Sequence, residues 1–268
     1  MPGRARNLDF GILTVTLMAS CNDSGNRYCC TIRSPEKRQV MVGVRFPSPE
    51  GRGVRGEVAR QMRSVDFYFD FSSTNSYFAA FMLPEICDRN HARVNWMPTH
   101  SAALFRGTGF DVMAMTVRKA RYLWRDHARY AEATGLPFKR PRRFPIKTAT
   151  ALRAVVACGH TAQLGDDGRS REQSHRLITQ AIMRAYWERD EDISDREVLT
   201  SIVSSAGFDG ATLLEIADST APREELAAIT EKAVERGVFG VPAFFVGNEM
   251  FWGKDRLDFV ERLLKRPE

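Results

Sequence analysis

The sequence predicts an α/β fold in which a strand–helix–strand unit and a later strand–strand–helix unit are separated by a block of helices. Residues 65–71 alternate apolar and polar side chains with the period of a strand. Residues 110–236 carry helical patterns, and residues 243–252 return to two short apolar runs around a Gly-Asn turn. A βαβ unit is therefore split from a ββα unit by a helical insertion.

The first strand is predicted at Val65–Phe71, where Val and Phe alternate with Asp and Tyr. Residues 72–75, Ser-Ser-Thr-Asn, are all good N-caps, and they precede the apolar helical stretch Tyr77–Leu83. A helix is therefore expected to begin where the strand ends. A second short strand is predicted at residues 94–97, and it stops at Pro98.

The middle of the chain is predicted to be helical. Asp195 is placed to cap one of these helices, and Pro222 suits the first turn of another. The five predicted helices contain no internal proline: Met115–Thr134, Thr148–His160, Glu172–Trp187, Arg196–Ala206 and Arg223–Arg236.

The last elements are a hairpin and a helix. Residues 243–246 and 249–252 are predicted to pair, and a helix with one apolar face follows Gly253. Pro242 stands directly before the first of these strands. A trans proline at the start of an edge strand and a cis peptide that turns the backbone toward a ligand explain it equally well.

Composition and charge exclude several classes of protein. Of the 268 residues, 43% are hydrophobic, which is enough to bury a core and excludes a disordered or collagen-like chain. The longest apolar run, Phe10–Ala19, is about half of the ~20 residues that a bilayer crossing needs, so no membrane protein is expected. The net charge of +6 arises entirely within residues 1–63, with eleven basic and five acidic residues, because the rest carries 28 of each. Nucleic-acid binding by the main body is therefore not expected.

Residues 1–61 are predicted to be a poorly ordered basic extension, because glycine and proline interrupt them and no sustained helical or strand period is present. The folded protein is expected to start near Met62. A competing hypothesis is an export or lipoprotein signal, in which two arginines precede the apolar residues 10–20 and Cys21. Asp9 fits such a signal poorly.

Cysteine and histidine predict no metal or dithiol centre. Beyond the extension the chain has only Cys87 and Cys158, 71 positions apart, which form no CxxC pair. The five histidines show no HxxxH spacing. The body of the chain therefore suits a reducing compartment, and a cytoplasmic protein is predicted. A basic cluster is expected to be a solvent-facing loop, although it could also frame an anionic substrate: Lys139, Arg140, Arg142, Arg143 and Lys147.

Several stretches of the chain resemble one known family. They are Asp66–Ser73 with the following Ser76 and Tyr77, Phe105–Gly109, and Val238–Val246 with Met250–Leu257. These residues resemble the 2-hydroxychromene-2-carboxylate isomerases, which belong with the kappa-class glutathione transferases. The likeness covers nearly all of residues 62–265, and it implies an α/β chain with a thioredoxin-like fold and an inserted all-helical domain.

The resemblance implies domain boundaries and a changed active-site turn. Residues 62–109 and 237–268 would form the thioredoxin-like domain, and residues 110–236 the inserted helical domain. The peptide before Pro242 is implied to be cis. Residues 73–76, Ser-Thr-Asn-Ser, stand where related disulfide oxidoreductases have CxxC, so thiol–disulfide exchange through this turn is chemically unavailable.

The resemblance also implies a glutathione site. Ser73 matches the family's serine, which donates a hydrogen bond to the sulfur of glutathione, and a helix N-terminus there also favours a thiolate. Capping the helix is the simpler role for Ser73, and the two roles can coexist. A hairpin exit with an N-cap at Asp255 would explain the C-terminal part of this site without a ligand. The other implied cofactor-binding residues are Val241, Pro242, Trp252, Gly253, Lys254 and Asp255.

Arg106 matches a family lysine before a glycine-rich turn, and it is implied to hold the carboxylate of the substrate, which arginine can bind bidentately. A solvated surface arginine is the alternative. Thr74 and Asn75 depart from the family, which has a proline and an aromatic residue at these positions. The Asn-Arg pair of the isomerases has no counterpart at residues 113–114.

The implied function is that of a glutathione-dependent isomerase acting on a small electrophile, an aromatic carboxylate. The implied mechanism has the thiolate add to the conjugated substrate and open its ring; rotation follows about the bond that has become single, and the thiolate leaves. The resemblance also implies a homodimer, with no nucleic-acid or membrane partner. Two alternatives are a kappa-like glutathione transferase or peroxidase and a non-catalytic thioredoxin-fold binding module.

Overall fold

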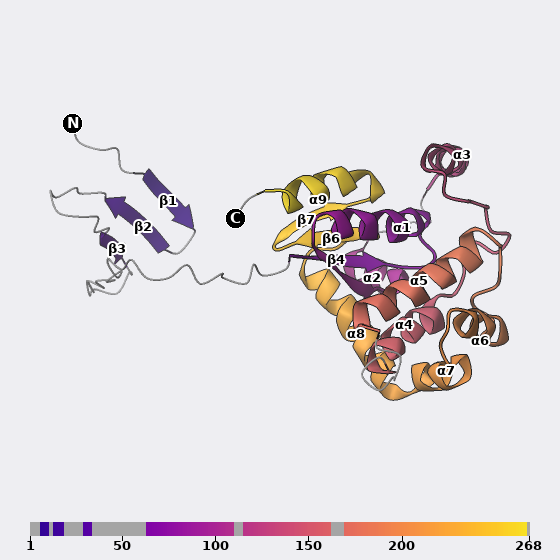
Figure 1. The fold of residues 1–268 in the computed structure, drawn as a ribbon. Coiled ribbons are helices and arrows are strands. Elements are labelled where there is room, and N and C mark those ends of the chain that lie inside the picture. The colour runs from indigo at the N-terminus through magenta and orange to yellow at the C-terminus, as the bar shows by residue number, and fades with distance from the viewer. Residues whose placement is uncertain are drawn as a thin grey trace. The chain divides into compact units, whose positions relative to one another are not determined.

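The computed structural model describes residues 63–109, 115–161 and 169–266, together with three short strands nearer the N-terminus (Figure 1). Two compact units are present, residues 1–59 and residues 60–268. The division of residues 62–268 into a thioredoxin-like domain, 62–109 with 237–268, and an inserted helical domain, 110–236, stays a prediction. No helix among the described residues is long and apolar enough to cross a membrane.

The N-terminal unit contains strands where the sequence analysis expected none. β1 (Arg6–Phe10), β2 (Leu13–Met18) and β3 (Cys29–Arg33) form an antiparallel sheet in the order β1-β2-β3. The residues of β2, Leu-Thr-Val-Thr-Leu-Met, alternate apolar and β-branched polar residues, a strand signal too short to stand out among the surrounding glycines and prolines. The other residues of the predicted extension lie outside the described residues.

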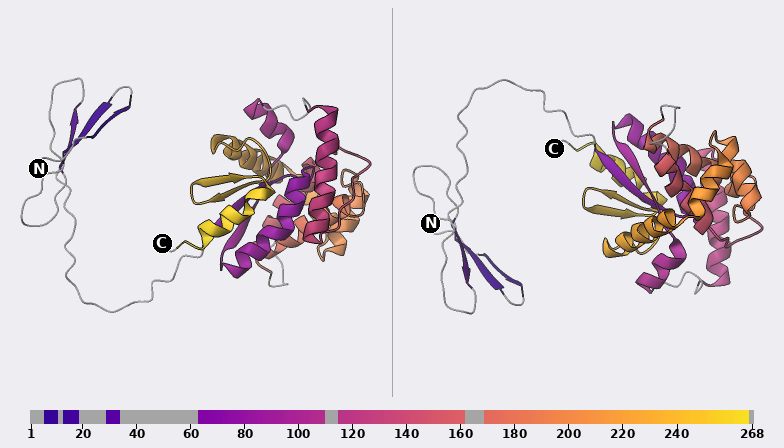
Figure 2. Two further views of the ribbon diagram at one scale, coloured as in Figure 1. Left: turned by 90° about the horizontal axis from the view of Figure 1, so that it is seen from above. Right: turned by 90° about the horizontal axis from the view of Figure 1, so that it is seen from below.

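The main unit is built on a four-stranded mixed sheet in the order β5-β4-β6-β7 (Figure 2). β4 pairs in parallel with β5 and antiparallel with β6, and β6 pairs antiparallel with β7, so the predicted βαβ and ββα units meet in one sheet. The four strands are β4 (Ser64–Phe69), β5 (Arg93–Pro98), β6 (Ala243–Val246) and β7 (Glu249–Trp252).

The predicted helices are confirmed to within a few residues, and the Asp195 side chain accepts hydrogen bonds from the Glu197 and Val198 amides, as a cap does. Two helices were not predicted, α2 and α7, because both are short and contain glycine, which lowers helix propensity. The helices are α1 (Thr74–Arg89), α2 (Ser101–Thr108), α3 (Val117–Thr134), α4 (Ala149–Thr161), α5 (Arg171–Trp187), α6 (Arg196–Ser205), α7 (Gly210–Asp218), α8 (Thr220–Glu235) and α9 (Leu257–Leu264), with the 3₁₀ turn η2 (Lys254–Arg256) before α9.

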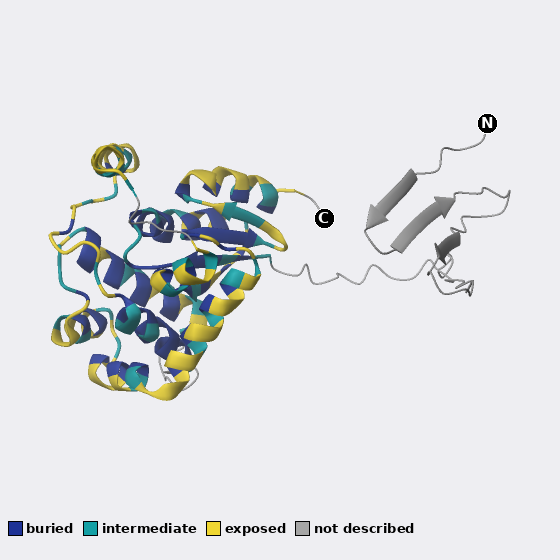
Figure 3. Cartoon of the chain, turned by 180° about the vertical axis from the view of Figure 1, so that it is seen from behind, coloured by how far each residue is buried: buried dark blue, intermediate teal, exposed yellow. Residues whose placement is uncertain are grey.

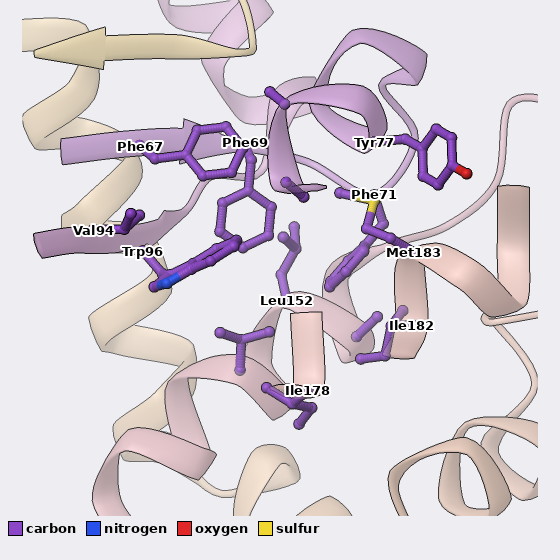
Figure 4. Packing of buried hydrophobic residues seen from close by; sticks show 14 of the residues in the cluster. Phe67, Phe69, Phe71, Tyr77, Val94, Trp96, Leu152, Ile178, Ile182 and Met183 are labelled. Carbon is purple, nitrogen blue, oxygen red and sulfur yellow. The ribbon is translucent and has the colours of Figure 1, made fainter. Parts of the chain in front are cut away.

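Side chains of β4 point to the two faces of the sheet in turn, because successive residues of a strand face opposite ways. Phe67 and Phe69 are fully buried in the larger core with Trp96 of β5, at ring centroid distances of 5.4 and 5.8 Å from the indole (Figure 4). Tyr68 faces the other way, into a smaller cluster that also contains Leu104 of α2. Helices therefore cover both faces of the sheet, with exposed residues on their outer sides (Figure 3).

α1 crosses the core although it contains Pro84. A proline inside a helix has no N–H for the carbonyl four residues earlier, here Ala80. The Gln180 side chain of α5 donates a hydrogen bond to that Ala80 carbonyl at 2.9 Å. The orphaned carbonyl is thus satisfied from the neighbouring helix, and α1 continues to Arg89.

Candidate functional site

The candidate site is built around the turn between β4 and α1. β4 ends at Phe69, and the Ser73 amide donates to the Asp70 carbonyl at 3.1 Å, which closes a turn. Ser73 is the N-cap of α1 with extended backbone angles (φ −94°, ψ 113°), and its Oγ accepts from the Ser76 amide at 3.2 Å. The capping role of Ser73 is therefore confirmed. The side chain is half-buried, so it is still accessible at the start of the helix.

Ser73 contacts the segment that contains the predicted cis peptide before Pro242. The peptide between Val241 and Pro242 is cis, and the Ser73 Oγ donates a hydrogen bond to the Val241 carbonyl oxygen at 3.2 Å. Two segments that are 168 residues apart in the sequence thus contact each other through the two residues that were singled out.

The loop after β7 lies against the same proline. The Gly253 amide donates to the Pro242 carbonyl at 2.9 Å, and Gly253 has a φ of +94°, a backbone conformation that favours glycine. The Trp252 side chain packs on Phe239 with 5.0 Å between ring centroids and remains 49% exposed. The Trp252 indole also lies close to Gly240: a Cβ on that glycine would lie 2.9 Å from the indole Nε1.

Lys254 is buried although it is a lysine, with 5% of its surface exposed. Its Nζ pairs with the Asp255 carboxylate at 2.7 Å and lies 3.8 Å from the ring centroid of Tyr130 in α3. Asp255 itself is exposed and lies within η2, where Gly253 is the N-cap. The hypothesis that Asp255 caps the last helix is wrong, because the N-cap of α9 is Arg256 and no side chain caps α9 or η2.

α3 contributes residues that the sequence analysis did not predict. The pKa of His127 is lowered to about 4, first by burial and then by the Lys254 charge, so the imidazole is neutral at pH 7. Its Nδ1 is buried without a hydrogen-bond partner among the described residues. Tyr130 donates to the Met82 sulfur at 3.3 Å, and burial together with Asp255 raises its pKa. The signal was the i, i+3, i+6 spacing of Trp124, His127 and Tyr130 on one helical face.

Aromatic rings pack behind the serine turn. The buried Trp187 indole N–H donates to the carbonyl of Phe71 at 2.9 Å, and Trp187 packs against Phe144, with 6.2 Å between centroids. Trp124 of α3 packs edge-on against Phe144 at 5.0 Å, and the Arg140 guanidinium stacks over Trp124 at 4.9 Å. Phe144 is 46% exposed, so this wall, with one member of the predicted basic loop, faces solvent in part.

Arg106 is not brought to the Ser73 turn by any contact among the described residues. It is exposed in the last turn of α2. The first residue of α2, Ser101, does approach the turn, with 3.5 Å between its Oγ and that of Ser72. The alternative of a solvated arginine therefore fits the structure, and a role in binding substrate stays a prediction.

Asp70 was also missed. The alternation of the predicted strand places Asp70 on the polar face with Asp66, but β4 ends at Phe69, two residues before the predicted end, and Asp70 is fully buried. One carboxylate oxygen accepts from the Ser72 amide at 2.9 Å and from its hydroxyl at 3.0 Å. The other accepts from the Ser101 amide at 2.8 Å and from its hydroxyl at 2.6 Å.

The arrangement suits anion binding at a helix start and is unsuited to cysteine chemistry. The first amides of a helix have no intrahelical acceptor, and the helix dipole favours negative charge beside them. Cys87 and Cys158 are both buried, and burial raises the pKa of Cys87 to about 12, so the Cys87 thiol stays protonated. No cluster of metal-ligating side chains occurs in the described ranges.

Comparison with known proteins finds a matching family and similar proteins. A family model described as a DsbA-like thioredoxin domain matches residues 64–265. A 2-hydroxychromene-2-carboxylate isomerase of Sphingobium xenophagum is 30% identical over 204 residues, which are 75% of this chain and 98% of that protein. Glutathione S-transferase kappa 1 of Rattus norvegicus is 23% identical over 216 residues, covering 75% of this chain and 91% of that protein.

Solved structures agree with the fold. A 2-hydroxychromene-2-carboxylate isomerase superposes with a TM-score of 0.64 at 27% identity, covering 75% of this chain and 94% of the other. The cytosolic disulfide reductase DsbM from Pseudomonas aeruginosa with GSH superposes with a TM-score of 0.52 at 18% identity, covering 76% of this chain and all of the other. The second likeness bears on the fold alone.

Proposed function

This chain belongs to the DsbA-like thioredoxin family, and we propose that within that family it is a glutathione-dependent isomerase of the 2-hydroxychromene-2-carboxylate type. The observation that carries the proposal is the contact of Ser73 with the Val241 carbonyl beside the cis peptide. A hydroxyl stands at the start of α1 where disulfide oxidoreductases place a thiol. Such a site suits the binding of an external thiolate.

The residues around Ser73 fit glutathione by their donor set. The Ser73 hydroxyl and the first amides of α1 are suited to the sulfur, and the backbone of Val241 lies beside them for the peptide. Lys254 and Asp255 are opposite charges 2.7 Å apart, and the γ-glutamyl end of glutathione carries a carboxylate and an ammonium. Trp252, half exposed, would flank the tripeptide.

Bound glutathione would supply the thiolate that adds to a conjugated substrate and leaves again, which permits ring opening and rotation. Ser73 would turn its hydroxyl hydrogen from the Val241 carbonyl to the sulfur, while its oxygen keeps the Ser76 amide. The N-terminus of α1 lowers the pKa of a thiol placed there, because the helix dipole favours the thiolate. Arg106 is our proposed partner for the substrate carboxylate.

The aromatic wall supports an aromatic substrate. Asn75 replaces the family's pocket aromatic, yet Trp124 and the half-exposed Phe144 present rings beside the same turn through Trp187 and Phe71. A homodimer and a cytoplasmic location remain predictions of the sequence.

A second candidate is a kappa-like glutathione transferase or peroxidase that acts on another electrophile. Asn75 favours it, because this half-buried polar side chain in the first turn of α1 suits a less apolar substrate than an aromatic ring would. The likeness to a kappa-class transferase supports the same thiol chemistry. Product analysis separates the two: an isomerase returns free glutathione, and a transferase keeps the conjugate or its oxidised product.

The test is the near-ultraviolet absorbance of glutathione bound to the protein between about pH 5 and 9, a range over which a free thiol of pKa about 8.5 passes from almost fully protonated to mostly ionised. We expect a thiolate band well below the pH at which free glutathione ionises, and loss of that band in Ser73→Ala. Ser170→Ala is the matched control, because Ser170 caps α5 and accepts the Gln173 amide at the same 3.2 Å but is not part of the candidate site. No band with saturating glutathione would leave a binding module without the proposed chemistry.

A further inference from the structure

Asp70 is the only acidic residue among those the structure describes that is buried as a whole residue, with 0% of its surface exposed. Its side-chain partners among the described residues are serine donors and no basic side chain, although an isolated buried charge is costly. Four hydrogen bonds hold the carboxylate instead, two from Ser72 and two from Ser101. A buried carboxylate with four hydrogen bonds, three residues before Ser73, is expected to position the residues that donate to it.

One carboxylate oxygen shapes the serine turn. The Ser72 amide donates to Asp70 Oδ1 at 2.9 Å, and the Ser73 amide donates to the Asp70 carbonyl oxygen at 3.1 Å. The side chain and the backbone of Asp70 thus fix the orientation of two successive amides. The side chain of Ser73 follows directly: its Oγ accepts from the Ser76 amide and donates to the Val241 carbonyl oxygen. The direction of the Ser73 hydroxyl therefore depends on Asp70.

The other carboxylate oxygen starts α2. His100 is the N-cap of that helix but makes no side-chain capping hydrogen bond. Asp70 supplies the missing acceptor, with Ser101 N at 2.8 Å and Ser101 Oγ at 2.6 Å. A carboxylate at a helix N-terminus is favoured by the dipole, so it holds α2 in place from outside the helix. α2 carries Arg106 in its last turn.

We propose that Asp70 is a positioning residue that ties the Ser73 hydroxyl and helix α2 to one buried carboxylate. Ser73, which would bind the thiol of glutathione, and Arg106 of α2, which would bind the substrate carboxylate, then keep a fixed relative position. This inference rests on the proposed glutathione-dependent function. Asp70 has no access to solvent, so it does not touch substrate; it acts through Ser72, Ser73 and Ser101.

Asp70→Asn tests the proposal with almost no change in shape. The amide keeps one acceptor oxygen, and its NH₂ group must face the N–H and O–H donors of either Ser72 or Ser101. We expect the pKa of the bound glutathione thiol to rise by about one unit, a tenfold loss of thiolate at low pH, and kcat/KM to fall ~10–100-fold. Below the pKa of the bound thiol, where glutathione binds in its protonated form, its affinity is expected to change less than ~3-fold, because Val241 and the Trp252–Asp255 loop are untouched.

Asp209→Asn is the matched control. Asp209 caps α7 and likewise accepts both the amide and the hydroxyl of one residue, Thr212, at 3.1 and 2.8 Å, but it is not part of the candidate site. We expect this variant to lose some stability and to leave the thiol pKa and kcat/KM unchanged. If Asp70→Asn behaves like Asp209→Asn while the wild type shows the thiolate band, the inference is overturned and the proposed function stands. Absence of the band in the wild type overturns both.

Ser72→Ala and Ser101→Ala keep the proposal testable if Asp70→Asn does not fold. Each removes one hydroxyl from one carboxylate oxygen. We expect Ser72→Ala to raise the thiol pKa with little change in the KM of an aromatic carboxylate substrate. Ser101→Ala is expected to raise that KM severalfold and leave the thiol pKa alone. Identical effects of the two variants on both quantities, or no effect of either, would contradict a two-armed anchor.

Discussion

At the scale of single residues, Gly240 sets how closely Trp252 can lie over the loop that precedes the cis peptide. A Cβ on Gly240 would lie 2.9 Å from the indole Nε1, so Gly240→Ala must displace the indole. The indole is 49% exposed and can move, so the melting temperature should change little. We expect glutathione affinity to fall ~3–10-fold, which corresponds to about 1 kcal/mol of lost contact. Titration calorimetry with glutathione measures it.

Gly210→Ala provides the contrasting control for that prediction. A Cβ on Gly210 would lie 2.4 Å from the backbone oxygen of Thr200, which cannot move as an exposed indole can. This variant should lower the melting temperature and leave glutathione affinity unchanged. Equal affinities of wild type and Gly240→Ala would show that Trp252 does not flank the cofactor.

Lys254 shows how one residue can connect two parts of the unit. Its buried ammonium pairs with Asp255 and lies over the Tyr130 ring. Burial lowers the pKa of His127 most, and the Lys254 charge lowers it further. Ala131 is the only buried residue of α3, and the partly buried rings of Trp124 and Tyr130 pack against the hydrophobic core. Lys254 therefore provides a contact between the loop of the candidate glutathione site and α3.

At the scale of secondary structure, α1 and α5 depend on each other through Pro84. The Gln180 amide satisfies the Ala80 carbonyl that Pro84 leaves open. Gln180→Ala should therefore cost about 1–3 kcal/mol of unfolding free energy, because a buried acceptor loses its donor. Urea denaturation measures the loss.

A double-mutant cycle isolates this interaction. Pro84→Ala restores a backbone N–H that can bond to the Ala80 carbonyl within the helix. In the Pro84→Ala background, Gln180→Ala should therefore cost clearly less than it does alone, with a coupling of about 1 kcal/mol. If the two substitutions are additive, the side chain of Gln180 contributes by packing and not by satisfying the carbonyl.

At the scale of the molecule, the sequence predicts the elements better than their meeting points. Alternation gave β4 and apolar periodicity gave the long helices, because each pattern is local. α2 and α7 escaped prediction because they are short and contain glycine, and they are held by contacts distant in sequence. Of these, the capping of α2 by Asp70 joins residues 31 positions apart, which no local pattern reveals.

The candidate site follows the same rule. Pro242 stands out by its place directly before a predicted strand, while the roles of Ser73 and of the Trp252–Asp255 loop follow from the family resemblance. The structure brings these three segments together. Asp70 was assigned to a polar strand face because its burial depends on where the strand ends. His127 and Tyr130 were passed over because their proximity to Lys254 depends on how α3 packs against the rest of the unit.

The N-terminal residues are expected to be dispensable for the fold and for the site. Residues 60–268 form one compact unit, and the family match begins at residue 64. A chain that starts at Met62 retains Arg63, whose guanidinium donates to the Leu263 carbonyl at 3.4 Å and to that of Leu264, near the end of α9. Its removal would free the C-terminal carbonyls of that helix, so residue 62 is the preferred starting point.

We therefore expect the chain of residues 62–268 to melt within about 2 °C of the full chain and to give the same thiolate band with glutathione, because a change of 1 kcal/mol shifts the melting temperature by only a few degrees in a unit of this size. The net charge of the shorter chain should differ strongly from that of the full chain. Residues 1–61 carry ten basic and five acidic residues, so their removal lowers the formal net charge from +6 to +1. Retention of the full chain on a cation exchanger should accordingly be lost in the shorter chain. A shorter chain that unfolds several degrees earlier, or that binds glutathione more weakly, would show that the N-terminal unit contributes to the main one.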